Sequence, residues 1–235
     1  MTDKSRDLER FYLVDYENIM SRGLVGRLWR HIHRLIDKPL ESLNRPRIIE
    51  VGSGNGQHFS QTKLSSSQYL EVDIREDMNR FLDLEKSKAN YRSFEIGDAT
   101  TLTHIKDRSY DALISTCLFA HLRDLEVAIG NWNRVVTEGG SLVIYVPCEP
   151  GILLRFIRHF STKKKLLKAG YDHSYIHWRE HRNHYPLMKS VITSEFANHS
   201  IKIKKFPFNF LPWDLNLFSL FIIKKNQYEN KRAKF

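Results

Sequence analysis

The chain has 235 residues, of which 41% are hydrophobic and 27% charged, and this ordinary globular composition excludes collagen-like and disordered proteins. Its longest apolar runs, 141–147 and 218–223, are much shorter than the roughly 18 residues of a membrane span. Two cysteines, Cys117 and Cys148, are too few for a disulfide framework. Because the charged N-terminus lacks the apolar segment of a secretory signal, we expect a single cytoplasmic domain.

Positive charge is concentrated in the last third of the chain. Residues 1–150 carry 20 Lys and Arg against 22 Asp and Glu, whereas residues 151–235 carry 17 against 5, a net charge of +12. A basic surface of this kind is either simply solvated or faces an anionic partner. Nucleic acid, an anionic membrane surface and a phosphorylated small molecule all remain open.

Residues 6–44 are expected to be helical, because apolar residues recur at helical spacing between Leu24 and Ile36. From Arg47 onward, short apolar runs alternate with polar helical stretches, a pattern that predicts βαβ units and a parallel sheet covered on both faces. The expected strands are Ile48–Val51, Tyr69–Val72, Tyr91–Ile96, Ala112–Ile114 and Leu142–Val146, and the helices between them are Gln57–Leu64, Arg75–Glu85 and Leu122–Val136.

Residues 149–190 break this alternation, since they are basic, aromatic and rich in histidine. An apolar helical stripe there is backed by basic residues; the stripe is Ile152, Leu153, Phe156, Ile157 and Phe160, and the basic residues are Arg155, Arg158 and Lys163–Lys165. Such a helix either docks on the core with a solvated basic edge or lies on an anionic membrane surface. Two further strands, Ile201–Phe206 and Leu215–Lys224, are expected to close the chain.

The strongest local signal is the glycine-rich turn Ile49-Glu-Val-Gly-Ser-Gly-Asn-Gly56, which follows the first strand. Glycine allows the positive φ that such a turn needs and a close approach of the backbone to a ligand. The spacing is G-x-G-x-G, and Gln57 stands where a dinucleotide fold has its third glycine. Asp73 ends the next strand, where an acid can accept hydrogen bonds from both hydroxyls of a ribose.

Six blocks together resemble the class I S-adenosylmethionine-dependent methyltransferases and cover about residues 47–147. They are Glu50-Val-Gly-Ser-Gly-Asn-Gly56, the strand ending in Asp73-Ile74, Gly97-Asp-Ala99, Tyr110-Asp-Ala-Leu-Ile-Ser-Thr116, His121-Leu122 and Asn133–Gly140. The chain is similar to quinone-pathway and secondary-metabolite members of the small-molecule type. The resemblance implies an α/β, Rossmann-like, doubly wound sheet of seven strands whose last strand is antiparallel, with N-terminal helices and a helical insertion after strand five.

The resemblance also implies S-adenosylmethionine as cofactor and assigns residues to it. The glycines let the backbone pack against the methionine part, Glu50 reaches the ammonium group, and Asp73 holds the ribose hydroxyls. Asp98 accepts from the adenine amino group. The remaining expected cofactor contacts are Tyr16, Gly52, Ser53, Gly54, Gly56, Ile74, Met78, Ala99, Ser115 and Thr116; for Tyr16 and Met78, simple packing is the alternative explanation.

We therefore divide the single domain, 1–235, into four parts. Residues 1–45 form an N-terminal helical cap and 46–148 the cofactor-binding core. Residues 149–190 form a basic insertion where small-molecule members build their substrate lid, and 191–235 provide a closing helix and strands.

Histidines are the candidate bases for an acceptor hydroxyl, and they are His121, His177 and His181, with Glu180 expected to hold one of them in a single tautomer. Residues 177–181 also match H-x-x-E-H, the pattern of an inverted zinc peptidase. We reject that function because a cofactor fold occupies the chain and no convincing third ligand follows. A metal bound by this cluster is the less favoured alternative, and no metal site is predicted.

The region after strand four restricts the acceptor. Ser115-Thr-Cys-Leu118 lacks the acid or Asn, the prolines and the aromatic residue of base-amino methyltransferases. Cys117 and Cys148 lie where RNA cytosine-C5 enzymes carry cysteines, but the flanking residues do not match, and buried packing is the commoner role. We expect methyl transfer to an oxygen or nitrogen of a small molecule: a sugar, a lipid-linked molecule or a secondary metabolite, in some cases anionic. An RNA methyltransferase and a catalytically silent cofactor-binding partner protein are the alternatives.

Overall fold

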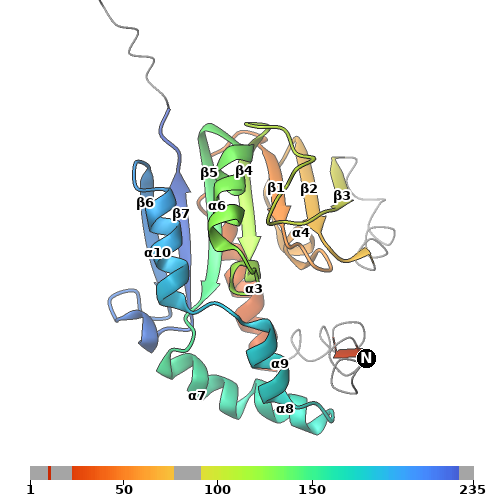
Figure 1. Ribbon diagram of the computed structural model, residues 1–235, viewed down its shortest axis with the longest axis vertical. Coiled ribbons are helices and arrows are strands. Elements are labelled where there is room, and N and C mark those ends of the chain that lie inside the picture. The colour runs from red at the N-terminus through yellow and green to blue at the C-terminus, as the bar shows by residue number, and fades with distance from the viewer. Residues whose placement is uncertain (1–9, 12–22, 77–90, 228–235) are drawn as a thin grey trace, which may run out of the picture.

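The computed structural model describes residues 10–11, 23–76 and 91–227. Its centre is a seven-stranded sheet in the order β3-β2-β1-β4-β5-β7-β6 (Figure 1). The strands are β1 (Arg47–Val51), β2 (Gln68–Asp73), β3 (Arg92–Ile96), β4 (Tyr110–Thr116), β5 (Val136–Pro147), β6 (Ser200–Phe206) and β7 (Phe218–Lys224). The first five pair in parallel, and β7 runs antiparallel to both β5 and β6. The expected doubly wound sheet with an antiparallel last strand is therefore confirmed.

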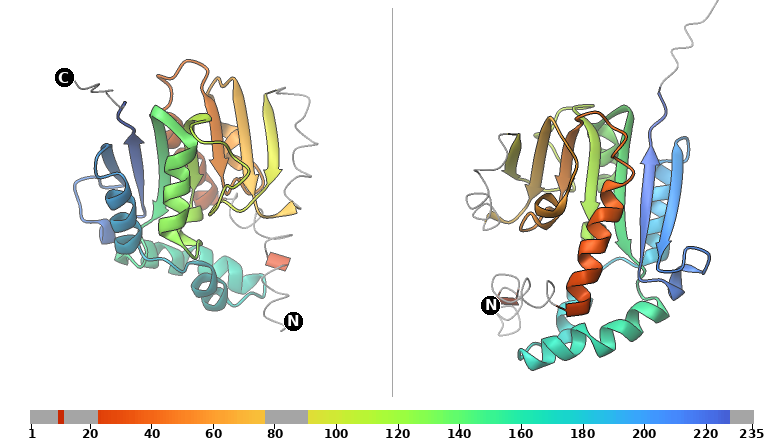
Figure 2. Two further views of the ribbon diagram at one scale, coloured as in Figure 1. Left: turned by 45° about the horizontal axis from the view of Figure 1, so that its top comes forward. Right: turned by 180° about the vertical axis from the view of Figure 1, so that it is seen from behind.

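Helices cover both faces of the sheet (Figures 1 and 2). On one face lie α3 (Gly23–Asp37) and α4 (Gln57–Gln61), where Ile32 and Ile36 are buried against Ile48 and Tyr69. On the other face lie α6 (Leu125–Val135) and α10 (Tyr185–Glu195), which bury Trp132 and Met188 among others. Full burial of a large apolar side chain stabilises the fold by roughly 1.5–3 kcal/mol. The amphipathic pattern of the sequence thus produces the two layers.

Three helices lie beyond the carboxyl ends of the parallel strands: α7 (Ile152–Phe160), α8 (Thr162–Lys168) and α9 (His173–Glu180) (Figure 1). Ligands of open α/β sheets bind at this edge. The apolar stripe expected on α7 divides into two sides. Leu153 and Ile157 pack against the core, whereas Ile152, Phe156 and Phe160 are 63%, 62% and 54% exposed.

The structure differs from the sequence expectations at several boundaries. Strand β5 begins at Val136, earlier than the expected Leu142. Its first pair, Val136 with Tyr110 of β4, is separated from the later pairs by a register shift, and the segment in between contains Gly139, whose φ is +72°. Helix α10 begins at Tyr185, inside the range expected for the insertion, and packs against α6. The short helix η4 (Trp213–Leu215) precedes β7, so that strand starts later than expected.

The helix expected over Arg75–Glu85 lies mostly outside the described residues. Within the described part of the chain, no helix has both the length and the apolar character needed to cross a bilayer.

Candidate functional site

The glycine-rich turn between β1 and α4 uses left-handed backbone at all three glycines, with φ of +70° at Gly52, +56° at Gly54 and +73° at Gly56. A Cβ on Gly52 would meet the side chain of Leu118 at 2.7 Å, and one on Gly56 would collide with Arg92. A Cβ on Gly54 would meet nothing within 4 Å. The protein's own packing therefore requires two of the glycines, while Gly54 borders open space.

Asp73 lies beside this turn at the end of β2. Its Oδ2 accepts a hydrogen bond from the Gly54 N–H at 2.9 Å, and its Oδ1 accepts one from the Arg75 N–H at 3.0 Å. The next residue, Ile74, is 70% exposed although it is apolar. A ribose hydroxyl and a flat aromatic ring are the kinds of group that such a carboxylate and such a side chain can contact.

Asp98 and Ala99 follow β3 at the same edge of the sheet. The exposed Asp98 accepts a hydrogen bond from the Thr100 N–H at 2.8 Å through Oδ1, and the buried Ala99 carbonyl accepts one from Nε1 of Trp132 at 2.7 Å. Helix α6 thus holds this loop through Trp132. Tyr16 and Met78, which we expected at the cofactor, lie outside the described residues.

Glu50 is completely buried at the end of β1. The Tyr69 hydroxyl donates to its Oε2 at 2.8 Å, and its Oε1 has no hydrogen-bond partner among the described residues. Burial raises the pKa of Glu50 to about 7, so the group is half protonated near neutral pH. A cation bound beside it would favour the carboxylate form, as the expected contact with an ammonium group requires.

Two further buried polar atoms near the turn have no partner in the described part of the chain: Oγ of Ser53 and Oγ of Ser115, on β4 next to β1. Thr116, at the end of β4, is half-buried. An unpaired buried polar group costs about 1–3 kcal/mol, so three of them around one turn indicate a place for ligand atoms. Together with the open space at Gly54, they fit S-adenosylmethionine.

A second cluster lies where β5 ends, around Glu149. Nδ1 of His181 lies 2.8 Å from Oε1 of this carboxylate, and Nε2 of His177 lies 3.7 Å from Oε2. The guanidinium of Arg158, on α7, forms an ion pair with Glu149. Burial alone would raise the pKa of Glu149, but His181 and Arg158 together hold it at about 2. The carboxylate is therefore ionised throughout the physiological range.

Hydrogen bonds explain why the histidines meet. The side chain of Asn183 donates to the Leu122 carbonyl at 2.7 Å, which ties the end of α9 to the loop that follows β4 and η3 (Leu118–Ala120). The Tyr185 N–H donates to the Glu149 carbonyl at 2.7 Å. As a result, the ring centroids of His121 and His181 lie 4.6 Å apart.

Burial lowers the pKa of both His121 and His177 to about 3, with help from neighbouring positive groups, so both rings are neutral. We expected Glu180 to orient a histidine. In the structure Glu149 lies beside His181, and the backbone of Glu180 forms a hydrogen bond with His121. Sequence reasoning missed Glu149, although its position directly after β5 was a usable signal.

Glu149, His177 and His181 also each offer a metal-ligating atom, and these atoms lie within 4.8 Å of one another. A guanidinium nitrogen of Arg158 lies 3.3 Å from Nε2 of His177 and pairs with Glu149. The position between the ligands is thus occupied by a cationic side chain that balances the carboxylate. This arrangement disfavours a divalent cation there.

Residues 49–144, which span β1 to β5 and contain the glycine-rich turn, match a family model described as a methyltransferase domain. Residues 49–144 thus resemble a methyltransferase domain, in agreement with the sequence blocks that are similar to the class I S-adenosylmethionine-dependent methyltransferases.

The chain is 31% identical over 123 residues to the malonyl-[acyl-carrier protein] O-methyltransferase of Methylococcus capsulatus, covering 50% of this chain and 44% of that protein. It is 30% identical over 102 residues to the demethylmenaquinone methyltransferase of Deinococcus radiodurans, covering 42% of each. The chain thus spans less than half the length of these two relatives. Among solved structures, the N-methyltransferase NodS from Bradyrhizobium japonicum shares the fold, with a TM-score of 0.61, 12% identity and coverage of 86% of this chain and 98% of that one.

The two cysteines of the chain do not have the properties of nucleophiles. Burial raises the pKa of Cys117 to about 12 and that of Cys148 to about 12, so both remain thiols at neutral pH. Since the thiolate is the nucleophile, the burial of both groups argues against a cysteine mechanism of RNA methylation.

Proposed function

We propose that this methyltransferase transfers a methyl group from S-adenosylmethionine to an oxygen or nitrogen of a small molecule, with His181 as the general base. The observation that carries the proposal is the pairing of His181 with the buried, ionised Glu149 at the carboxyl edge of the sheet. The name of the Methylococcus relative, an O-methyltransferase, supports transfer to oxygen.

On the cofactor side, Asp73, Glu50 and the turn at Gly54 are the residues that would hold S-adenosylmethionine. Asp73 would accept from the ribose hydroxyls, and the carboxylate of Glu50 would attract the ammonium group. When bound, the cofactor supplies an electrophilic sulfonium methyl group, which passes to the acceptor as the carbon–sulfur bond breaks. The protein's main task is then to align acceptor and methyl group, an effect worth up to ~7–11 kcal/mol.

On the acceptor side, Glu149 determines what His181 can do. A carboxylate oxygen 2.8 Å from Nδ1 favours a proton on that nitrogen, so that Nε2 would carry the lone pair of the base. Nε2 can then take the proton of an attacking hydroxyl or amine, while Glu149 stabilises the imidazolium that forms. General-base catalysis of this kind contributes about 10²–10⁴ in rate.

The first test is calorimetric titration of the wild type with S-adenosylhomocysteine, beside Asp73→Ala and the control Glu126→Ala. Glu126 is an exposed carboxylate on α6, so its loss is matched in charge. We expect Asp73→Ala alone to weaken binding at least tenfold. A wild type that does not bind S-adenosylhomocysteine would overturn the proposed function.

The second test follows methyl transfer from labelled S-adenosylmethionine to a panel of sugars, sugar phosphates, quinols and lipid-linked acceptors. We expect His181→Ala to lower the rate by about 10²–10⁴ without changing the affinity for S-adenosylhomocysteine. His184→Ala is the control, because His184 is exposed and makes no capping hydrogen bond. Equal rates for His181→Ala and His184→Ala would remove the base from the proposal.

A further inference from the structure

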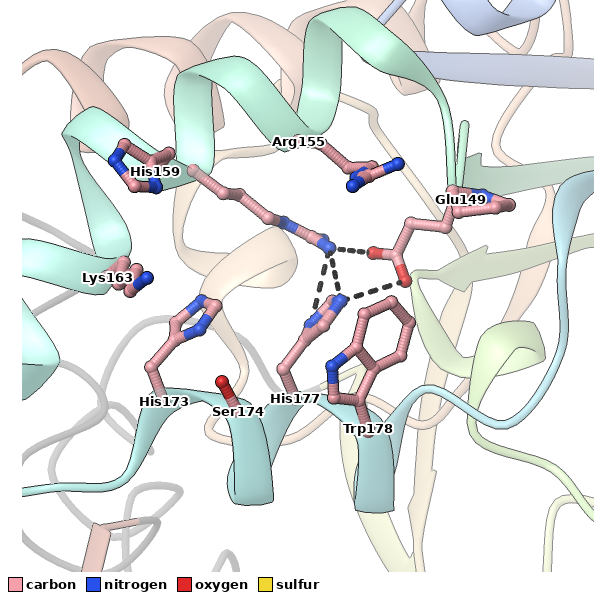
Figure 3. Close-up of a pocket in the computed structure, with 10 residues that line it drawn as sticks. Glu149, Arg155, His159, Lys163, His173, Ser174, His177 and Trp178 are labelled. Carbon is pink, nitrogen blue, oxygen red and sulfur yellow. Dashed lines mark hydrogen bonds and ion pairs between the residues drawn. The ribbon is translucent and has the colours of Figure 1, made fainter.

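A pocket of about 160 Å³ lies between α7 and α9, with Lys163 of α8 at one end and Glu149 at the other (Figure 3). The side chains that line the pocket come from α7, α8, α9 and the segment between β5 and α7 (Figure 3). They are Glu149, Pro150, Arg155, Arg158, His159, Lys163, His173, Ser174, His177 and Trp178.

The charge of this lining is positive. Arg155, Arg158 and Lys163 are cationic, and Glu149, the one carboxylate of the lining, is already paired with Arg158. Arg155 and Lys163 form no ion pair with any residue that the structure describes. Burial lowers the pKa of His173, and the charges of Arg158 and Lys163 lower it further, as a positive field requires.

The hydrogen-bonding groups of the pocket suit one class of anion. Arg155, Lys163 and Ser174 line the pocket from three different helices and offer a guanidinium, an ammonium and a hydroxyl group, which are donors for a ligand with oxygens on several sides. A phosphate has such oxygens and a charge of about −1.5 to −2. This charge matches the two unpaired cations, whereas a carboxylate would leave one of them unbalanced.

We propose that the α7–α9 pocket binds a phosphate group carried by the methyl acceptor. This inference rests on the proposed function, because it assigns the pocket to the substrate of the same reaction. Glu149 and His177 belong both to the pocket and to the histidine cluster around His181. A phosphate held there therefore anchors the acceptor beside the base.

The acceptor is either a soluble phosphorylated molecule or a lipid with a phosphate headgroup. The outer side of α7 bears on this choice, since Ile152, Phe156 and Phe160 are more than half exposed on the same helix that supplies Arg155 and Arg158. An apolar stripe beside basic residues is suited to the surface of an anionic bilayer. The experiment therefore includes one probe for each source.

The direct test is calorimetric titration with inorganic pyrophosphate, performed without cofactor and again with saturating S-adenosylhomocysteine. The variant Arg155→Ala/Lys163→Ala removes the two unpaired cations. Its control, Lys189→Ala/Lys202→Ala, removes two exposed cations on α10 and β6 and changes the net charge equally. We expect pyrophosphate binding to weaken at least tenfold in the pocket variant and to be unchanged in the control.

The second arm measures sedimentation with phosphatidylcholine vesicles that contain or lack phosphatidic acid. A lipid acceptor predicts that the wild type binds only the vesicles with phosphatidic acid, and that Phe156→Ser/Phe160→Ser and the pocket variant both lose this binding. A soluble acceptor predicts pyrophosphate binding without vesicle binding. Either result supports the phosphate site.

Equal pyrophosphate affinity in the wild type and the pocket variant would overturn the inference, because the two unpaired cations would then contribute nothing. This outcome is distinct from failure of the proposed function, which would show itself as a wild type that does not bind S-adenosylhomocysteine, whatever its affinity for pyrophosphate.

Discussion

Gly54→Ala separates ligand binding from folding more cleanly than any other change in the glycine-rich turn. An alanine at φ +56° pays the cost of left-handed backbone, about 1–2 kcal/mol, and its new methyl group meets nothing within 4 Å. Gly52→Ala has the same backbone cost at φ +70°, and its methyl group would also lie 2.7 Å from the side chain of Leu118. Overpacking adds roughly 1–3 kcal/mol, so the total is about 2–5 kcal/mol.

Binding of S-adenosylhomocysteine, unlike stability, should depend strongly on Gly54. The open space beyond Gly54 is where we place the cofactor, so an added methyl group should weaken S-adenosylhomocysteine binding at least tenfold, which is about 1.4 kcal/mol. Urea unfolding measures the stability of both variants, and calorimetry measures their affinity. A Gly54→Ala protein that binds S-adenosylhomocysteine like the wild type would show that the open side of the turn does not contact the ligand. A stability loss as large as that of Gly52→Ala would show that the space is not open.

Three further predictions concern buried polar groups. The pKa of Glu149 is held at about 2, below the ordinary 4.5. Its ionised form therefore adds about 3 kcal/mol to the free energy of unfolding above pH 4.5, and this contribution is lost as the pH falls toward 2. Urea unfolding of Glu149→Gln between pH 3 and 7 should lack this pH dependence, and its methyl transfer should be slowed. Glu50 has the opposite sign, because a pKa of about 7 means that the wild type loses stability as the pH rises from 4.5 to 7. Glu50→Gln should therefore be more stable than the wild type at pH 8, by at most about 3 kcal/mol, and equal destabilisation at pH 5 and pH 8 would contradict the assignment. Finally, Trp132→Phe leaves the Ala99 carbonyl without its donor and should lower the free energy of unfolding by about 1–3 kcal/mol, measured by urea titration.

The sheet, and the positions of the residues expected at the cofactor, could be predicted from the sequence because their signals are local. The apolar runs of β1, β2 and β4 and the glycines after β1 are contiguous, and Asp73 and Asp98 are placed by the strands that they follow. Topology then brings these strand ends to one edge of the sheet without further information.

The acceptor side could be predicted only in part, because it depends on contacts between distant residues. Glu149 contacts His181 although the two are 32 residues apart in the sequence, and no sequence periodicity relates them. His177 and His181 are four residues apart, a spacing compatible with one helix face, although α9 ends at Glu180; this spacing does not show that the carboxylate of Glu149, after β5, lies beside them. Likewise, helical periodicity showed the stripe on α7, while the packing of Leu153 and Ile157 decides which half stays exposed.

The placement of two tryptophans has a spectroscopic consequence. The indole of Trp132 is fully buried and hydrogen-bonded to the loop at Ala99, whereas that of Trp178 is 55% exposed and lines the α7–α9 pocket. Emission from the first should be blue-shifted and insensitive to iodide, and emission from the second red-shifted and readily quenched. Comparison of the wild type with Trp178→Phe, in which Trp29, Trp132 and Trp213 remain, should therefore identify the emission that reports occupancy of the proposed α7–α9 pocket.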